Sequence, residues 1–359
     1  MTLNLMLALG AVALLALVLI AGLSRWAMRS AAHFARLALF TTGLTFILVV
    51  VGAYVRLSDA GLGCPDWPGC YGEPHMPPVL PAAQADSVPA GGFDVAKGWK
   101  EMGHRYLASF VGMLIAALAL AAVRARGLLG RSPALPLFLV LVVIAQAALG
   151  RWTVTLLLKP AIVTLHLLGG MTTLALLTLI TLRASSGAAQ TIHGDAVVRV
   201  RSLALFGLVV VSLQVLLGGW VSTNYAALAC PDLPMCRGEW VPPMSFTHAF
   251  EVLRELGRTG DGDVLPLEAL TAIHWVHRLG AVVVFCVALW LGSRLVRVGA
   301  LKSLGLLLVA LVGMQLCLGI GNVIFSLPLW LAAAHNAGAA ALLVLMVVIN
   351  FKAGGLGRA

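Results

Sequence analysis

The side chains that could do chemistry in this chain lie in two short stretches, each at the start of an apolar run. The stretches are Glu101–Arg105 and His274–Arg278. In the first, Glu101 comes three residues before His104, so both side chains lie on one face of a helix. An imidazole can ligate a metal or carry a proton, and a carboxylate one turn away can exchange protons or stabilise positive charge. Ionisable groups within an apolar run indicate such a role.

The rest of the chain is too apolar for a soluble protein. Its 359 residues are 60% hydrophobic and 11% charged, and their mean hydropathy is +0.99. Nine apolar runs each approach the ~20 residues that a helix needs to cross a bilayer. They cover residues 3–23, 36–55, 103–123, 136–157, 161–182, 203–222, 271–292, 303–325 and 331–350. The sequence therefore predicts an all-α polytopic membrane protein.

Basic residues mark one side of this predicted membrane protein. They fill alternate connections between the runs, with Asp195 as the one acidic residue on that side. The positive-inside rule puts these connections in the cytoplasm. The N-terminus is then outside, the C-terminus is cytoplasmic, and two long loops, 57–100 and 223–268, lie outside. The net charge of +10 follows the loops, so it does not indicate nucleic acid. We expect a multi-pass protein of a bacterial plasma membrane.

The chain repeats itself once, with motifs in the same order and at nearly constant spacing. The repeated motifs are Cys64–Cys70 with Cys230–Cys236, His104-Arg105 with His277-Arg278, and Gln146, Gly150 and His166 with Gln315, Gly319 and His335. We predict two homologous four-helix bundles in tandem, residues 31–183 and 203–352, joined by a cytoplasmic linker, residues 184–202. An even number of spans in each half implies a relating axis along the membrane normal.

Residues 1–30 stand outside the repeat and hold the apolar run 3–23. This run lacks the basic n-region and the Ala-x-Ala cleavage site of a signal peptide. We therefore expect an extra N-terminal transmembrane helix that is retained, and the sequence indicates no function for it.

Four histidines lie at matched depth near the outer ends of predicted spans. They are His104, His166, His277 and His335. Two imidazoles on separate helices of one bundle can ligate a haem iron from opposite faces. A lone histidine in a membrane helix is more often a packing or proton-relay residue, but a matched set of four favours haem. Zinc and copper are disfavoured, because neither half adds a matching carboxylate or thiol within the membrane.

Arginines accompany these histidines. Arg105 and Arg278 directly follow two of them. Each is either a snorkelling anchor at the membrane interface or the partner of a haem propionate, a carboxylate that needs a donor. The first half adds Arg56 and Arg151, which the second half does not repeat. All four are candidates for positioning a haem.

Several of these motifs form a set that is specific as a whole. They are Arg56-Leu57-Ser58, Gly61–Cys70, Glu101-x-x-His104-Arg105, Leu149–Val154 and Thr164–Leu167. Together they resemble the haem A synthase family, over about residues 36–350. The resemblance implies two four-helix bundles, one that binds haem b and one that binds haem O as substrate. It also implies oxidation of a methyl group of haem O, through hydroxymethyl to formyl, to give haem A for cytochrome oxidase assembly.

Positions where the repeat breaks indicate which half does chemistry. Glu101 is replaced by His274 in the second half, so the first half alone carries the carboxylate. We assign the substrate haem to His104 and His166, with Glu101 as catalytic carboxylate, as the family pattern also implies. Haem b is assigned to the two histidines of the second half. Glu101 could instead be a carboxylate favoured by the helix dipole, and His274 is either a core residue or part of a propionate or proton path.

Four cysteines lie in the two long outer loops. The outer compartment is oxidising, and each short, proline-containing spacing allows a pair to close. We predict the disulfides Cys64–Cys70 and Cys230–Cys236. The first is either structural or redox-active, and a structural role is favoured for the second.

Three functions are compatible with these residues. The first is haem O oxidation, with the haem of the second half passing electrons. The second is a di-haem b-type electron-transfer protein, such as a quinol or thiol oxidoreductase, and the third is a haem-binding or transport module. A carboxylate and arginines confined to one half favour the enzyme. Its expected partners are the haem O synthase that supplies the substrate, cytochrome oxidase assembly factors, a quinol or thiol carrier as electron donor, and the lipid bilayer.

Overall fold

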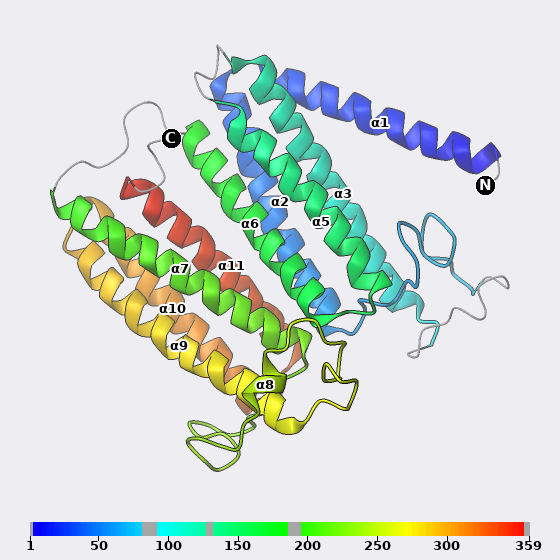
Figure 1. The fold of residues 1–359 in the computed structure, drawn as a ribbon. Coiled ribbons are helices and arrows are strands. Elements are labelled where there is room, and N and C mark those ends of the chain that lie inside the picture. The colour runs from blue at the N-terminus through cyan, green and yellow to red at the C-terminus, as the bar shows by residue number, and fades with distance from the viewer. Residues whose placement is uncertain (1–2, 81–91, 127–131, 186–194, 355–359) are drawn as a thin grey trace.

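The computed structural model describes residues 3–80, 92–126, 132–185 and 195–354, and its long elements are all helical (Figure 1). In the first half these are α1 (Leu3–Ala27), α2 (Ala31–Leu57), α3 (Val95–Arg124), α5 (Ala134–Thr155) and α6 (Pro160–Ser185). In the second half they are α7 (Asp195–Thr223), α8 (Phe246–Ala249), α9 (Leu267–Val296), η2 (Gly299–Leu301), α10 (Lys302–Ile324) and α11 (Leu329–Lys352). Pairing of β type in these ranges is limited to isolated bridges in the loops.

Eight helices are long and apolar enough to cross a membrane. They are α2, α3, α5, α6, α7, α9, α10 and α11. The prediction of an all-α polytopic membrane protein is thereby confirmed. The ninth predicted span is α1, of which the part with described side chains, Val12–Ala27, is apolar but shorter, so its passage through a membrane stays a prediction. In Figure 1, α1 adjoins the other helices at its C-terminal end and diverges from them toward its N-terminus.

The segment predicted as a linker is partly helical. α7 begins at Asp195, so residues 195–202 belong to this helix, and residues 186–194 lie outside the described part of the chain. Charged residues end an apolar run, but they do not end a helix, because a helix can continue beyond the hydrocarbon layer. A helix that begins at Asp195 is compatible with a linker before the membrane-spanning part, and the bounds 184–202 stay a prediction.

The spanning helices pack as two groups of four, which Figure 1 shows side by side. In one group α2, α3, α5 and α6 form a closed ring of neighbours, and α7, α9, α10 and α11 do the same in the other. Each group has its own apolar core. Contacts between the groups run from α6 and α2 to α11 and from α6 to α7. The helices at this contact are thus the first and last of each group.

The two groups also touch through residues at equivalent positions of the repeat. Arg56 donates to the carbonyl oxygen of Ser222 (2.7 Å), and the Tyr225 hydroxyl donates to Oδ1 of Asp59 (3.0 Å). Partners in both pairs are 166 residues apart, as Cys64 and Cys230 are. Equivalent residues meet where a twofold axis passes, so the contact lies close to the axis expected along the membrane normal. The Arg56 guanidinium also lies 4.0 Å from the centre of the Tyr225 ring.

A sharp turn comes directly before α6, which carries His166, and another comes directly before α11, which carries His335. Before α6, Leu157 and Leu158 have φ of 49° and 59°, and before α11, Ser326 and Leu327 have φ of 56° and 63°. The left-handed region is unfavourable for such side chains. One turn connects α5 to α6 and the other connects α10 to α11, and each pair of helices is antiparallel. Because the two turns have the same backbone shape, α6 packs against α5 in the same register as α11 against α10.

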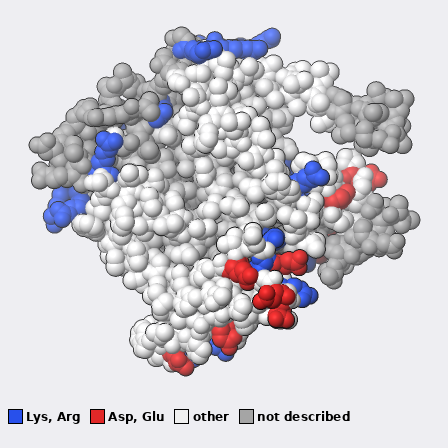
Figure 2. Space-filling view, in the orientation of Figure 1, with Lys and Arg blue, Asp and Glu red and all other residues white. Residues whose placement is uncertain are grey.

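Charge is distributed unevenly between the two ends of the molecule. We call the end formed by residues 58–80 and 224–266 the disulfide end. On the face in Figure 2, Asp and Glu gather at this end, whereas Lys and Arg dominate the opposite end. This distribution is the one on which the predicted orientation rests.

We predict that Arg56→Ala weakens the contact between the two groups. The side chain is 14% exposed, and its loss removes a charged hydrogen bond and a cation–π contact, together about 1–3 kcal/mol. Thermal unfolding of the detergent-solubilised protein should show a lower midpoint than for wild type. Arg36→Ala, an exposed position on the same helix, is the control and should leave the midpoint unchanged. Equal unfolding midpoints for the two variants would contradict the conclusion that Arg56 stabilises the contact between the two groups of helices.

Candidate functional site

Two predicted ligands face each other within the first group of helices. His104 on α3 and His166 on α6 have ring centroids 6.5 Å apart, with an angle of 75° between the ring planes. Metal–nitrogen bonds of roughly 2 Å on either side of one ion account for most of such a separation. The pair is therefore placed to share one metal ion.

A glycine of a neighbouring helix lies against each of the four predicted ligands. The pairs are Gly52 with His104, Gly150 with His166, Gly218 with His277 and Gly319 with His335. A Cβ built on any of these glycines would lie 3.0–3.2 Å from the nearest atom of the imidazole ring, which is tighter than ordinary van der Waals contact. The glycines thus allow each ring to lie close against the backbone of the neighbouring helix, where a side chain would not fit.

The second group of helices repeats the arrangement. His277 on α9 and His335 on α11 lie close enough to interact electrostatically. Nδ1 of His335 is buried without a hydrogen-bond partner, as is Nδ1 of His166 at the equivalent position of the first group. Both halves therefore hold one two-histidine site, at the same helices and the same depth.

These donors fit a haem iron. Within the described ranges, no group of three or more His, Cys, Asp or Glu side chains could hold a metal ion. Two imidazoles do not complete a tetrahedral zinc site, whereas a porphyrin supplies the four equatorial ligands of its iron and leaves the axial positions to the protein.

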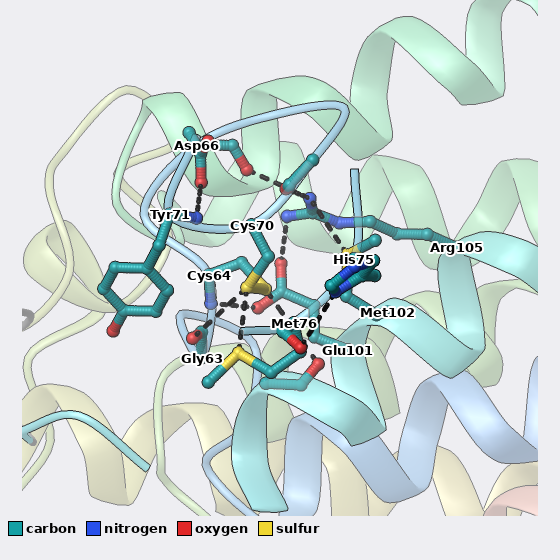
Figure 3. The surroundings of a disulfide bond; sticks show 12 residues. Gly63, Cys64, Asp66, Cys70, Tyr71, His75, Met76, Glu101, Met102 and Arg105 are labelled. Carbon is teal, nitrogen blue, oxygen red and sulfur yellow. Dashed lines mark hydrogen bonds and ion pairs between the residues drawn. A yellow bond between two sulfur atoms is a disulfide. The ribbon is translucent and has the colours of Figure 1, made fainter. Parts of the chain in front are cut away.

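Glu101 connects the first histidine site to the disulfide end (Figure 3). It lies one turn before His104 on α3 and is 5% exposed. Its Oε2 accepts the backbone N–H of Cys64 (2.9 Å), and its Oε1 accepts from Nη2 of Arg105 (2.5 Å). Because both carboxylate oxygens are bound, the side chain is held in one orientation.

His274 occupies the position of Glu101 in the second half. Its Nδ1 lies 3.3 Å from the backbone N of Cys230, and its Nε2 lies 3.3 Å from Nε of Arg278. Both neighbours are N–H donors, whereas a neutral imidazole has one acceptor nitrogen. His274 therefore satisfies one of them at a time and offers Arg278 no negative charge. The second half keeps the contact with its loop but lacks the ionisable acid.

Each disulfide loop is bound by an arginine of the helix below it. Arg105 donates to carbonyl oxygens within Asp66–Gly69, at 2.5–3.3 Å. Arg278 donates in the same way to Cys230, Asp232 and Met235, at 2.6–2.9 Å. Carbonyls that would otherwise be unpaired in a tight loop are thus satisfied by a charged donor.

An aspartate closes each loop from the other side. Asp66 accepts the backbone N–H groups of Tyr71 and Gly72, and Asp232 accepts those of Arg237 and Gly238, at 2.5–2.8 Å. The N–H of Gly238 is the main cause that lowers the pKa of Asp232 below its usual value. The stability from this carboxylate is therefore present above its ordinary pKa and is lost as pH falls through the lowered value.

Comparison with known proteins assigns the chain to a family. Residues 35–347 match the COX15-CtaA family, described as cytochrome oxidase assembly protein. The chain belongs to this family. It is 42% identical to a haem A synthase of Shewanella oneidensis, over 87% of this chain and 94% of that protein. It is 30% identical to a haem A synthase of Chelativorans sp. and 29% identical to one of Methylobacterium radiotolerans, each over 85% of this chain.

The COX15-CtaA match includes both histidine sites and both disulfide loops. It also contains Glu101, whereas α1 lies before the matched residues. These alignments cover 85–94% of the length of the three relatives. The whole fold of eight spanning helices is therefore shared, and the extra helix is outside the match.

The structure contains the predicted disulfides and shows what the four candidate arginines contact. Both predicted disulfides, Cys64–Cys70 and Cys230–Cys236, are confirmed. Three of the four arginines bind backbone carbonyls: Arg105 and Arg278 hold the loops, and Arg56 bridges the two groups. Arg151 is exposed and has no hydrogen bond or ion pair from its side chain within the described residues. A role at haem propionates stays a prediction for all four.

Sequence reasoning missed the glycines and the loop aspartates. Gly52 and Gly218 repeat in the chain, as do Asp66 and Asp232, so the signal was present in the self-comparison. A repeated glycine four helical turns into an apolar run indicates close approach of something to the backbone. The bond between Glu101 and the Cys64 N–H left no such signal, because one partner is a backbone group.

We predict that Arg105→Ala exposes the Cys64–Cys70 disulfide to reduction. Its three loop carbonyls lose their charged donor, so the loop opens more often, by about ten-fold for a loss of about 1.4 kcal/mol. Thiol labelling during dithiothreitol treatment measures the rate. Cys230–Cys236 is a control within the same molecule, because Arg278 still holds it. Unchanged relative rates would show that Arg105 does not restrain the loop.

Proposed function

We propose that the protein is a haem A synthase, which oxidises a methyl group of haem O to a formyl group and so provides haem A for cytochrome oxidase assembly. One observation carries the proposal: of two repeated histidine sites, a single one has a buried carboxylate one turn away. The family match and the curated relatives named haem A synthase support it. Two similar histidine sites, of which the first alone has an acid beside it, fit one haem that reacts and one haem that stays bound.

In this proposal the first half, residues 31–183, binds the substrate. His104 and His166 would ligate the iron of haem O, and Gly52 and Gly150 contact their rings from the neighbouring helices. Glu101 lies on the same helical face as His104, where one turn is ~5.4 Å.

Glu101 is the proposed catalytic carboxylate. Oxidation of a methyl carbon builds positive charge and releases protons, and a buried carboxylate both stabilises that charge and takes up a proton. Arg105 and the Cys64 N–H orient the carboxylate before the reaction. His274 cannot replace it, because an imidazole between two N–H donors carries no negative charge.

The second half, residues 203–352, holds haem b in this proposal. His277 and His335 would hold its iron, and Gly218 and Gly319 contact their rings. When bound, haem b would supply a one-electron couple for electron transfer with the reacting site. The contact of Arg56 and Asp59 with Ser222 and Tyr225 fixes the two halves against each other.

The proposed setting follows from charge. The basic end faces the cytoplasm together with the C-terminus, and the disulfide end faces outward in the plasma membrane of a bacterium. Its bilayer supports the eight spans, a haem O synthase supplies the substrate, and cytochrome oxidase assembly factors receive the product. An electron carrier of the quinol or thiol class exchanges electrons with the haems. Residues 1–30, 184–202 and the two halves are the proposed divisions of the chain.

We expect haem O to be converted when the chain is produced together with a haem O synthase. Chromatography of extracted haems should show haem A or its hydroxylated precursor beside haem B. His277→Ala and His335→Ala should lose haem B, whereas His104→Ala and His166→Ala should keep haem B and lose the product. A protein that carries haem B alone in both halves, with no product, would instead be a di-haem electron-transfer protein.

Substitution of Glu101 by His separates its two roles. The second half shows that an imidazole at this position accepts from the loop N–H, so Glu101→His should preserve the Cys64–Cys70 loop. Product formation should fall by about 10²–10⁴-fold, because the acid–base group is lost. The rate of disulfide reduction serves as the structural control. Full activity of the variant would remove Glu101 from the chemistry.

A further inference from the structure

The Cys64–Cys70 disulfide lies within a cluster of sulfur atoms (Figure 3). Sγ of Cys70 is 3.2 Å from the thioether sulfur of Met76, and Met102 of α3 packs in the same cluster. All four side chains are at most 1% exposed. Thioethers and cysteine sulfurs are soft, polarisable groups, so this cluster differs in its chemistry from an ordinary apolar core.

A glycine of α3 makes room for one of these thioethers. A Cβ built on Gly98 would overlap Sδ of Met76, so a larger residue at this position would push the thioether out of its place. In the second half the equivalent residue, six positions before the helix histidine, is the buried Thr271. The surface of α3 is therefore shaped for a thioether beside the first disulfide.

The second disulfide loop replaces both buried thioethers. Six residues after its second cysteine it has Pro242 in place of Met76, and two residues before its helix histidine it has Trp275 in place of Met102. Each loop is nevertheless closed by an aspartate and bound by an arginine. The thioethers are thus not needed to fold such a loop, and they indicate a function of the first loop.

Contacts that do not involve sulfur hold the first loop in its shape. Arg105 binds the carbonyl oxygens of Asp66 and Gly69, and Cys70 and Glu73 exchange two backbone hydrogen bonds, at 2.8 and 3.1 Å. Reduction of the disulfide removes none of these contacts. Two thiols and a thioether would then remain together as a preformed set of ligands.

This set of ligands is selective for monovalent copper. Cysteine and methionine sulfurs are soft ligands that favour Cu(I), whereas zinc sites use thiolate, imidazole and carboxylate. An imidazole, which also suits copper, is available next to Met76 at the exposed His75, where the second loop has Val241. It would serve as an entry ligand between solvent and the buried sulfur atoms.

We propose that the first disulfide loop is a Cu(I) site, which forms when Cys64–Cys70 is reduced and in which the two thiolates and the thioether of Met76 bind the ion. The reductant is a dithiol of the outer compartment, which gives two electrons and two protons to the disulfide and becomes a disulfide itself. Each cysteine thiol then releases its proton to solvent as its sulfur binds Cu(I). This inference goes beyond the proposed function and does not depend on the haem sites.

Anaerobic competition with a chromophoric Cu(I) chelator tests the proposal on the full-length protein in detergent. One variant keeps only the first cysteine pair, through Cys230→Ser and Cys236→Ser, and the other keeps only the second, through Cys64→Ser and Cys70→Ser. After reduction by a phosphine, the variant with the first pair should bind one Cu(I) at least about 10-fold more tightly, because a thioether completes its site.

Substitution of the thioether distinguishes a metal ligand from a packing residue. In the variant with the first pair, Met76→Leu nearly conserves side-chain volume and should lower the Cu(I) affinity about 10-fold, with two sulfur ligands in place of three by X-ray absorption. Thermal unfolding of the oxidised protein should stay unchanged. Met244→Leu, in the second outer loop and against a different core, is the matched control and should keep the affinity. His75→Ala should slow copper uptake and leave the affinity unchanged.

Several results would overturn the copper site. These are equal Cu(I) affinities for the two cysteine-pair variants, equal affinities for Met76→Leu and Met244→Leu, or displacement of the bound Cu(I) by an excess of Zn²⁺. The proposed function is decided by a different measurement, the haem content of the histidine variants, so the two proposals can fail independently.

Discussion

The structure depends on the close approach of an imidazole to the backbone of a neighbouring helix. At four places a glycine lies so near a histidine ring that a Cβ would stand 3.0–3.2 Å from it. Lipid gives membrane helices no hydrophobic drive to associate, so small residues decide where they meet. Here the same glycines decide how far apart the helices stay around the rings. The positions of α2 and α5 in one half, and of α7 and α10 in the other, follow from this contact.

Duplication makes the differences between the halves informative. The two sites share helices, register, turns and loops, so a residue that changes does so on an unchanged backbone. Glu101 and His274 both accept from a loop N–H, yet only the first carries an acid. The sequence difference then bears on chemistry rather than on folding.

Much of the fold could be predicted, because the signals are periodic or repeated. Apolar runs predicted the spanning helices, and the second copy of Cys64–Cys70 made both disulfides credible. Interactions with backbone groups were not predictable. The sequence did not indicate that Arg105 binds the carbonyls of Asp66–Gly69, because any sequence supplies carbonyls. The start of α7 at Asp195 was missed since charge was taken as the end of a helix.

The disulfide loop and the proposed acid, Glu101, hold each other in place. The Cys64 N–H that Glu101 accepts belongs to a disulfide-bonded residue, and Arg105 binds both the loop carbonyls and the other carboxylate oxygen. Closing the loop therefore orients the carboxylate, and the carboxylate in turn anchors the loop to α3. In the second half Asp232 closes the equivalent loop and Arg278 anchors it to α9, and His274 adds no charge to that contact. A loop of the same shape thus contacts the proposed acid in one half and an imidazole in the other.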